Sequence, residues 1–301
     1  MRTITDAVLA VDVGGTRLRA ALVDVDGTVR ERRSQPTPQD TSCPDALLTL
    51  TNEVLGSRSA SHAVIALPGV VNYCDGFLEH APNLPADWAP HLNRAGLEAH
   101  LGVPVELAND ADAAAVGEAL FGAGRSYQDV VYLTVSTGIG AGVLLGGRLV
   151  AGARSTAEVG HTILDLRARQ EGRPSTLEEL GSGKALGRFA AAADLPSDGA
   201  QILELVRSGD RQARRVWDDV VDAVAAGVHN LVHLFSPDVV VLGGGVGRTG
   251  DLLEPVRDAV RSHAEEGRAT PVQVVGAVLG DDAGLVGAAG WRRAAVGRVH
   301  R

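Results

Sequence analysis

Two turns that lie far apart in the chain are rich in glycine and threonine, and each joins two apolar segments. The first reads Asp-Val-Gly-Gly-Thr over residues 12–16, and the second reads Ser-Thr-Gly-Ile-Gly-Ala-Gly over residues 136–142. Such turns leave backbone N–H groups and a hydroxyl uncovered, and these groups bind phosphate oxygens. Either turn alone could be an ordinary hairpin turn. Two turns of the same design predict two similar half-domains that face one nucleotide.

Two carboxylates stand where phosphate chemistry could use them. Asp12 ends an apolar segment, so its charge needs a partner or a cation, and hydrated Mg²⁺ is a candidate. Asp110 follows Asn109 between an expected strand and an expected helix, where side chains of α/β proteins point into a cleft. Phosphoryl transfer to a hydroxyl needs a carboxylate that accepts the proton. Helix capping is the structural alternative for Asp110.

Other polar and glycine-rich segments could complete a binding site. The glycine cluster at residues 243–247 follows an apolar segment and could hold a nucleotide base or ribose, with a close-packed turn as the alternative. Glu158, His161 and Glu178 carry the groups that pair with sugar hydroxyls. A buried core histidine is the alternative for His161.

The composition limits the class of protein. The chain has 301 residues, of which 45% are hydrophobic and 22% charged, which is typical of a globular protein with one or two domains. The net charge of −9 argues against nucleic-acid binding. The two cysteines, Cys43 and Cys74, exclude a disulfide framework. We find neither a signal-peptide pattern nor an apolar run of the ~20 residues that a membrane helix needs, so we expect a cytoplasmic location without a membrane partner.

Strands and helices alternate along the chain, which predicts an α/β protein, and the hairpin openings predict mixed sheets. Strands are expected at 7–13, 17–25, 28–34, 62–67, 103–107, 130–135, 140–145, 148–150, 238–242 and 272–275. Helices are expected at 45–56, 90–101, 111–121, 177–193, 199–208, 211–235, 251–264 and 283–295. Residues 72–90 and 165–176 are expected to be irregular, and residues 243–247 to form a turn.

Taken together, these segments resemble the ROK family of bacterial sugar kinases, repressors and uncharacterised open reading frames. The similarity covers nearly the whole chain, and its segments are residues 12–16, 68–69, 81–84, 109–115, 136–142, 158–161, 242–246 and 282–288. The resemblance implies an actin-like ATPase fold of the hexokinase, HSP70 and ribonuclease H type, with two mixed-sheet domains and a cleft between them. It implies an N-terminal lobe of residues 1–114 plus 285–301, with the first phosphate turn and the catalytic aspartate. The C-terminal lobe, residues 115–284, would hold the second phosphate turn, the adenosine site and the sugar-contacting loop.

The resemblance also implies roles for individual residues. Asp110 would be the general base that activates a sugar hydroxyl, usually the one on carbon 6. The implied sugar-binding residues are Gly69, Asn83, Asn109, Glu158, His161 and Glu178. The implied phosphate and Mg²⁺ positions are Asp12, Gly14, Gly15, Thr16, Thr137 and Gly138, with Gly244 and Gly245 near adenosine. ATP and Mg²⁺ are therefore expected, together with a small-molecule sugar substrate and a homodimer.

One departure from the family lies after His161. The family usually carries Cys-x-Cys-Gly-x-x-Gly-Cys-Leu-Glu there, and the aligned residues 169–178 place Arg169, Glu171 and Thr176 at the three cysteine positions. Structural zinc needs a closed set of Cys or His ligands. We therefore expect no zinc, and a loop held by packing and hydrogen bonds, with Arg169 beside Glu171 or Asp165.

The sequence thus predicts ATP-dependent phosphorylation of a hexose-like substrate at its 6-hydroxyl. Glucose, or an amino-glucose such as kanosamine, is the expected substrate, because the lost cysteines and the altered segment 152–157 lie on the sugar side. A C7-cyclitol or N-acetylmannosamine kinase is the alternative. A non-catalytic sugar-binding regulator is the alternative of another class. ROK repressors carry a helix-turn-helix before the first phosphate turn, and that turn starts here near residue 12, so no nucleic-acid partner is expected.

Overall fold

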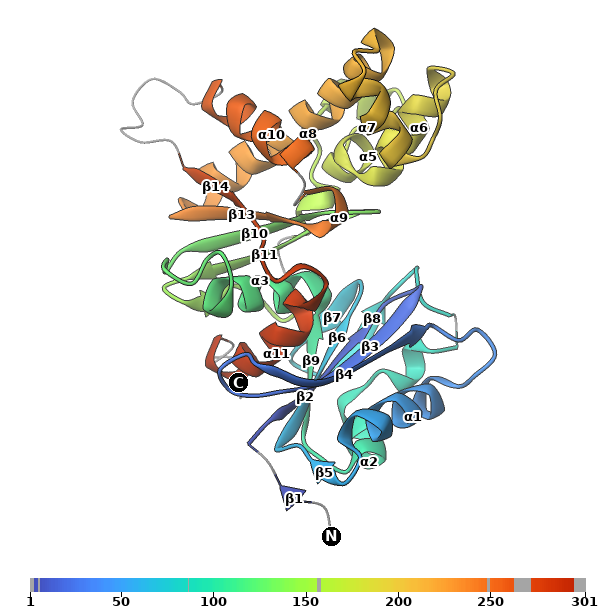
Figure 1. Ribbon diagram of the computed structural model, residues 1–301, viewed down its shortest axis with the longest axis vertical. Helices are drawn as coiled ribbons and strands as arrows, with labels where there is room; N and C mark the ends of the chain where they lie inside the picture. Colours follow the sequence, from blue (N-terminus) through green and yellow to red (C-terminus); the bar gives the residue numbers. More distant parts are fainter. Residues whose placement is uncertain are drawn as a thin grey trace. The chain divides into compact units, whose positions relative to one another are not determined.

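The computed structural model describes residues 3–4, 6–85, 87–155, 158–247, 250–262 and 272–294 (Figure 1). By their contacts, residues 1–128, 142–156 and 281–301 form a first compact unit, and residues 129–141 and 157–280 form a second. The lobe boundaries expected from the sequence stay a prediction. Residues 156–157 of the altered segment, and residues 263–264 and 295 of two expected helices, lie outside the described residues. Among the described helices, none combines the length and apolar character that a membrane crossing needs.

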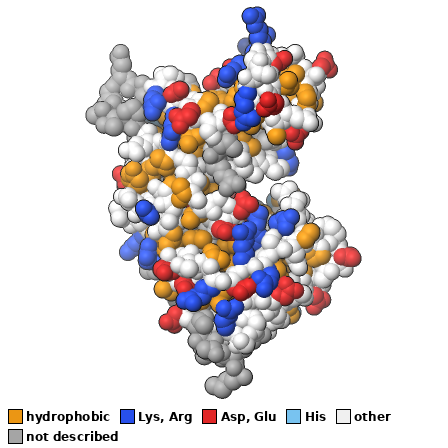
Figure 2. Space-filling model, viewed as in Figure 1, with side chains coloured by type: hydrophobic (Ala, Val, Ile, Leu, Met, Phe, Trp, Pro, Cys, Tyr) orange, Lys and Arg blue, Asp and Glu red, His pale blue; other side chains and the backbone are white. Residues whose placement is uncertain are grey.

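The first unit is built on a five-stranded sheet with the order β4-β3-β2-β6-β9. The strands are β2 (Val8–Val13), β3 (Arg17–Val23), β4 (Val29–Pro36), β6 (His62–Leu67) and β9 (Val105–Asn109). The hairpin strands β2, β3 and β4 are antiparallel, whereas β6 runs parallel to both β2 and β9. Strand β6 is buried along its whole length, as expected for a parallel strand covered on both faces. The edge strand β4 instead carries Arg30, Arg32 and Arg33, and blue side chains gather over this region in Figure 2. Charges of this kind protect a sheet edge from pairing with another chain.

Helices cover both faces of the first sheet (Figure 1). They are α1 (Cys43–Leu55), α2 (Arg94–Leu101), α3 (Asp110–Phe121) and α11 (Ala283–Ala294). One face packs its leucines and valines against α1, and α11 covers the other face beside α3. A Cβ atom at Gly117 would collide with the carbonyl oxygen of Ala283, and one at Gly287 with that of Ala113. The backbones of α3 and α11 therefore approach each other closely because two glycines face the partner helix.

The segment at 72–90 was expected to be irregular, and this expectation is wrong in part. It takes part in a hairpin of β7 (Val70–Asn72) and β8 (Phe77–His80), and it also contains the 3₁₀ turn η1 (Ala89–His91). Gly76, at φ +71°, provides the turn between the two strands. Strands of three and four residues are too short to produce a readable periodicity. A second short sheet is formed by the parallel strands β1 (Thr3–Ile4) and β5 (Arg58–Ser59).

The second five-stranded sheet has the order β12-β11-β10-β13-β14. Its strands are β10 (Val130–Val135), β11 (Ile139–Leu145), β12 (Arg148–Leu149), β13 (Val239–Gly243) and β14 (Gln273–Gly276). Strand β13 is parallel to both β10 and β14, whereas β11 and β12 are antiparallel. Two mixed five-stranded sheets confirm the predicted α/β fold with mixed sheets.

The remaining helices differ from the sequence expectation at three places. They are η2 (Val159–His161), α4 (Leu166–Gln170), α5 (Leu177–Gly181), α6 (Gly183–Ala192), α7 (Gly199–Arg207), α8 (Arg211–Phe235), α9 (Gly244–Gly247), α10 (Gly250–Ser262) and η3 (Gly280–Asp282). The expected helix 177–193 is split at Ser182, whose backbone is extended and whose side chain caps α6 by accepting a hydrogen bond from the N–H of Ala185. The polar segment 165–176 contains α4, and the expected glycine turn at 243–247 includes a single helical turn.

The glycine contact between α3 and α11 gives a stability prediction. Gly287→Ala should lower the free energy of unfolding by about 1–3 kcal/mol, because the new methyl group collides with backbone that cannot yield. Gly284→Ala on the same helix is the control, since a Cβ there meets no atom within 4 Å. Urea denaturation of both variants measures the difference. Equal stability of the two variants would contradict the close approach of the helices.

Candidate functional site

The predicted site residues of the first unit cluster at one edge of its sheet. In the parallel register, Asp12 on β2 lies opposite Ala66 on β6, and Leu67 lies opposite Asn109 on β9. The first phosphate turn, the Pro68-Gly69 turn and the start of α3 therefore follow the carboxyl ends of neighbouring strands. This edge is where open α/β sheets bind their ligands.

Asn109 connects two of these segments through its buried side chain. Its Oδ1 accepts hydrogen bonds from the backbone N–H groups of Ala111 at 3.0 Å and Asp112 at 3.1 Å. Its Nδ2 donates to the carbonyl oxygen of Gly69 at 2.9 Å. Gly69 has φ +84°, and a Cβ there would collide with the carbonyl oxygen of His80, so the turn requires glycine. The sugar-binding role of Asn109 and Gly69 stays a prediction.

Asp110 is the first residue of α3, and its side chain is exposed. Its Oδ1 accepts a hydrogen bond from the N–H of Ala111 at 2.8 Å. The positive end of the helix dipole stabilises a carboxylate at this position. The N-cap of α3 is Asn109, so the capping role considered for Asp110 is filled by its neighbour. The geometry leaves the Asp110 carboxylate at the surface of the first unit, where a substrate could reach it.

Asp12 has a partner within the sheet. Arg19, directly opposite on β3, donates through Nη1 to Asp12 Oδ2 at 2.9 Å. Burial raises the pKa of Asp12, and the hydrogen bond and charge of Arg19 reduce this rise without cancelling it. Arg19 therefore compensates the charge of Asp12 in part, and the expected role of Asp12 toward Mg²⁺ stays a prediction.

The first phosphate turn lies against the segment that contains Asn83. The N–H of Gly14 donates to the carbonyl oxygen of Arg17 at 3.0 Å, which closes the turn. A Cβ atom at Gly15 would collide with the carbonyl oxygen of Asn83. Thr16 and Asn83 are both exposed. One predicted phosphate position and one predicted sugar position are thus adjacent.

The second phosphate turn, between β10 and β11, is held by a carboxylate. Glu178 Oε2 accepts a hydrogen bond from the N–H of Ile139 at 2.8 Å. A Cβ at Gly138 would lie 2.5 Å from the same oxygen, so glycine is needed for this approach. The N–H of Ser136 donates to the carbonyl oxygen of Gly138 at 2.9 Å, and Thr137 remains exposed. Glu178, predicted as a sugar ligand, therefore also orders the phosphate turn.

Glu158 and His161 lie near Glu178 in the second unit. His161 Nε2 is 4.0 Å from Glu158 Oε2. Burial raises the pKa of Glu158; the neighbouring His161 lowers it, and the like charge of Glu178 raises it further. A Cβ at Gly160 would collide with the carbonyl oxygen of Ile139, so this segment packs directly on the second turn.

The glycines predicted to lie near adenosine follow β13, which pairs with β10. Gly244 has φ +83°, and a Cβ there would collide with the carbonyl oxygen of Val135. A Cβ at Gly245 would meet no atom within 4 Å, and this residue is exposed. The second unit therefore places the predicted adenosine residues beside the end of the strand that leads into the phosphate turn.

The loop that lacks the family's cysteines is held by ion pairs and a helix cap. Glu171 pairs with Arg167 at 3.2 Å and with Arg173 at 2.6 Å, rather than with Arg169 as expected. Thr176 caps α5 through a reciprocal pair of hydrogen bonds with Glu179. Within the described ranges, no group of three or more His, Cys, Asp or Glu side chains could hold a metal ion. The expected absence of zinc stays a prediction.

Glu179 is a structural carboxylate that the sequence analysis did not single out. It accepts hydrogen bonds from the N–H groups of Ser175 at 2.9 Å and Thr176 at 3.0 Å. These two donors lower the pKa of Glu179 to about 2. The pattern Thr-x-x-Glu at residues 176–179 is the sequence signal that predicts such a cap.

Sequence reasoning also missed Tyr73 and Asp112. The Tyr73 hydroxyl lies 2.6 Å from Asp112 Oδ2, and it accepts a hydrogen bond from the N–H of Asn109 at 3.0 Å. Tyr73 was overlooked because it falls in the segment that was expected to be irregular. An acidic residue at position 112 of an alanine-rich helix was the available signal.

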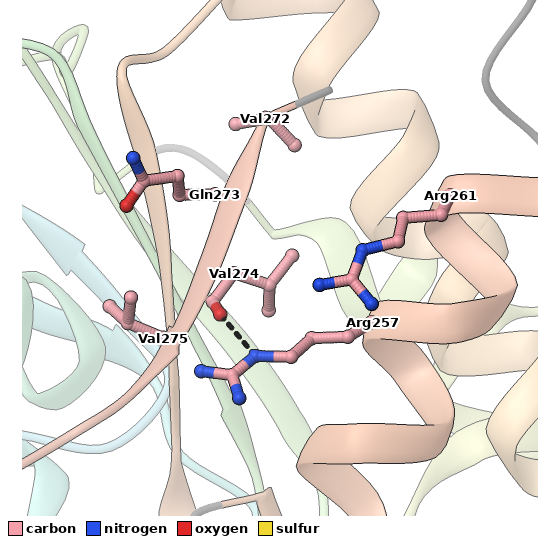
Figure 3. A pocket seen from close by; sticks show the side chains of 6 residues that line it. All are labelled: Arg257, Arg261, Val272, Gln273, Val274 and Val275. Atoms are coloured by element: carbon pink, nitrogen blue, oxygen red, sulfur yellow. Dashed lines mark hydrogen bonds between the residues drawn. The ribbon is translucent and has the colours of Figure 1, made fainter. Parts of the chain in front are cut away.

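A pocket of about 370 Å³ lies in the second unit, apart from these residues (Figure 3). It is lined by Arg257, Arg261, Val272, Gln273, Val274 and Val275, and Arg257 Nε donates to the carbonyl oxygen of Val274 at 2.6 Å. None of the predicted site residues lines it. The pocket is therefore not part of the candidate site.

Comparison with known proteins decides the family. The sequence profile of the ROK family matches residues 8–295. The chain belongs to the ROK family. The resemblance inferred from the motifs is thereby confirmed.

Several relatives are sugar kinases. A glucokinase of Thermotoga maritima is 32% identical, covering 93% of this chain and 95% of its own length. An N-acetylmannosamine kinase of Citrobacter koseri is 33% identical, and the match covers 93% of this chain and 97% of that kinase. A bifunctional enzyme NanE/NanK of Brucella melitensis is 37% identical over 94% of this chain, which spans about half of that relative, 53% of its length.

Solved structures agree with this assignment. The ROK hexokinase of Thermus thermophilus superimposes with a TM-score of 0.83 at 34% identity, covering 94% of this chain and 96% of that chain. A ROK family glucokinase of Streptomyces griseus, in complex with glucose and AMPPNP, superimposes with a TM-score of 0.79 at 31% identity. The match covers 95% of this chain and 99% of that chain. This ROK protein is a sugar phosphotransferase, and the predicted class of an ATP-dependent sugar kinase is confirmed at that level.

The raised pKa of Glu158 predicts a pH-dependent stability. A raised pKa means that folding favours the protonated carboxyl. The ionised form of Glu158 therefore costs stability once the pH rises above 4.5, the ordinary pKa of a glutamate side chain. Glu158→Gln should therefore stabilise this ROK kinase at pH 7 by up to about 1 kcal/mol, because solvent screens the half-exposed charge. The gain should disappear near pH 4. Denaturant unfolding at both pH values measures it, with Glu53→Gln on α1 as an exposed control. A loss of stability at pH 7 would contradict the assigned burial cost.

Proposed function

We propose that the chain transfers the terminal phosphoryl group of ATP to the 6-hydroxyl of a hexose-like substrate, with Asp110 as the general base. The preferred substrate is glucose or an amino-glucose such as kanosamine. The observation that carries the proposal is the exposed Asp110 carboxylate at the start of α3, on the sheet edge that also holds the first phosphate turn. A base at this position can accept a hydroxyl proton as the oxygen attacks the phosphoryl group.

ATP would lie along both phosphate turns. The N–H groups of Gly15 and Thr16 in the first unit, and of Thr137 and Gly138 in the second, would stabilise the charge that spreads over the phosphate oxygens, while the N–H of Gly14 closes the first turn. Mg²⁺ would enter with ATP as part of the substrate, with Asp12 near it through water. Gly244 and Gly245 would adjoin adenosine, and a Cβ at Gly245 would meet no atom within 4 Å.

The proposed sugar-binding residues form one group in each unit. Glu158, His161 and Glu178 lie together in the second unit, and carboxylates and imidazole are suitable partners for the hydroxyls of a sugar. In the first unit, Asn83 adjoins the first phosphate turn at Gly15, and Gly69 accepts a hydrogen bond from Asn109, the neighbour of Asp110. An ammonium group on the substrate would suit the carboxylates of this site, which is why an amino-glucose is included.

The similarity to N-acetylmannosamine kinases supports a second sugar substrate, N-acetylmannosamine. A C7-cyclitol is a further alternative. A non-catalytic sugar-binding regulator is the less favoured reading, because Asp110 and both phosphate turns are present and the net charge is −9. A homodimer in the cytoplasm, without structural zinc, is part of the same proposal.

The general base gives the first test of the proposal. Asp110→Asn should lower kcat by a factor of ~10²–10⁴ while the Kd for the sugar stays close to that of the wild type. The asparagine Oδ1 can keep the hydrogen bond from Ala111, so the helix start should remain intact. ATP consumption and sugar binding are measured beside Asp40→Asn, an exposed control in the first unit. Near-normal turnover in Asp110→Asn would exclude the assigned base.

A substrate panel gives the second test. We expect the highest kcat/KM for glucose or kanosamine among glucose, mannose, N-acetylmannosamine, kanosamine and a C7-cyclitol, because the grouped carboxylates favour a hexose with hydroxyl or ammonium donors. A coupled assay of ADP release measures each substrate. A maximum for N-acetylmannosamine or the cyclitol would replace the proposed substrate. Turnover that is absent with every sugar would contradict the kinase itself.

A further inference from the structure

A buried carboxylate lies two residues after the proposed base. Asp112, in the first turn of α3, is fully buried, and its Oδ2 is 2.6 Å from the Tyr73 hydroxyl. Burying a carboxylate costs free energy unless hydrogen-bond donors compensate it. Tyr73 comes from the turn between β7 and β8, which is distant in sequence, so this bond joins the hairpin to the start of α3.

The same hydroxyl also binds the residue that precedes the base. The N–H of Asn109 donates to Tyr73 Oη at 3.0 Å. A backbone N–H cannot accept a hydrogen bond, so the phenol proton points to Asp112. The two hydrogen bonds together connect the N–H of Asn109, through the Tyr73 hydroxyl, to the carboxylate of Asp112. In the sequence, Asp110 lies between Asn109 and Asp112, the two residues that this hydroxyl connects.

Contacts on other sides fix the position of Tyr73. Its N–H donates to the carbonyl oxygen of Ala153 at 2.8 Å. Its ring lies 6.0 Å from the ring of Trp291 on α11, measured between centroids and at an angle of 51°. Arg94 Nη2 donates to its carbonyl oxygen at 3.4 Å. The phenol is therefore a rigid support rather than a mobile surface group.

We propose that Tyr73 is a positioning residue for Asp110, acting through the hydrogen bonds of its hydroxyl to Asn109 and Asp112. This inference rests on the proposed role of Asp110 as the general base. Asn109 sets the direction in which the chain leaves β9, and Asp112 fixes the first turn of α3, so together they determine where the Asp110 carboxylate lies. A displacement of about 1 Å in such a group can cost a factor of ~10² in rate.

The test is Tyr73→Phe, which removes the hydroxyl and keeps the ring. We expect kcat to fall about 10- to 100-fold, while KM for the sugar and for ATP changes little. Tyr127→Phe is the matched control, because it also removes a phenol hydroxyl from the first unit but lies outside the candidate site. A mainly structural role would instead lower stability and leave kcat per folded molecule unchanged.

A second variant keeps the test decisive if Tyr73→Phe folds poorly. Tyr73→Phe/Asp112→Asn also replaces the buried carboxyl group that faced the removed hydroxyl, so it should regain stability while kcat stays low.

The outcomes separate this inference from the proposed function. A wild-type kcat in folded Tyr73→Phe, or in the double variant, overturns the positioning role. If Asp110→Asn is inactive at the same time, the general base stands and only the role of Tyr73 is lost. If Asp110→Asn keeps its turnover, the proposed base fails, whatever Tyr73→Phe shows.

Discussion

One buried amide side chain, that of Asn109, connects the strands and the helix on which the first half of the site depends. Its oxygen caps α3, and its nitrogen binds the turn that follows β6, so both ends of the amide are engaged. A parallel register brings the carboxyl ends of β2, β6 and β9 to one edge, but it does not fix the loops that follow them. The amide provides that connection. The exposed position of Asp110 follows from it, because the capping role is already filled.

The second unit achieves a similar connection with a charged group. Glu178 binds the backbone of the second phosphate turn, and glycine at positions 138 and 160 is needed because any Cβ there would come too close to Glu178 or Ile139. Glu158 lies near this carboxylate, and its pKa is raised mainly because the carboxyl is partly buried, with a further rise from the like charge of Glu178. Functional sites commonly carry such costs, because the arrangement serves the ligand rather than the stability of the fold.

The sequence predicted the long elements well and the short ones poorly. The bounds of β6, β10 and α8 agree with the sequence expectation, since each has a long apolar run or a clear helical periodicity. The hairpin of β7 and β8 was missed because strands of three and four residues are too short for an alternation of polar and apolar residues to be recognised. The glycine and threonine content of the two turns indicated a phosphate site. Tyr73 could not be predicted, because its partners are set by tertiary contacts with α3 and α11.

The loop at 161–178, which lacks the cysteines of the family pattern, is positioned by hydrogen bonds of its own residues. The ion pairs of Glu171 are solvent-exposed and therefore contribute little stability. The stronger constraints are backbone bonds, from Leu164 N–H to Ser175 O at 2.8 Å and from Leu177 N–H to Thr162 O at 3.0 Å. Thr176, at the third cysteine position of the family pattern, caps α5 with Glu179. Because Glu178 lies in the first turn of that capped helix, the cap fixes its approach to the phosphate turn.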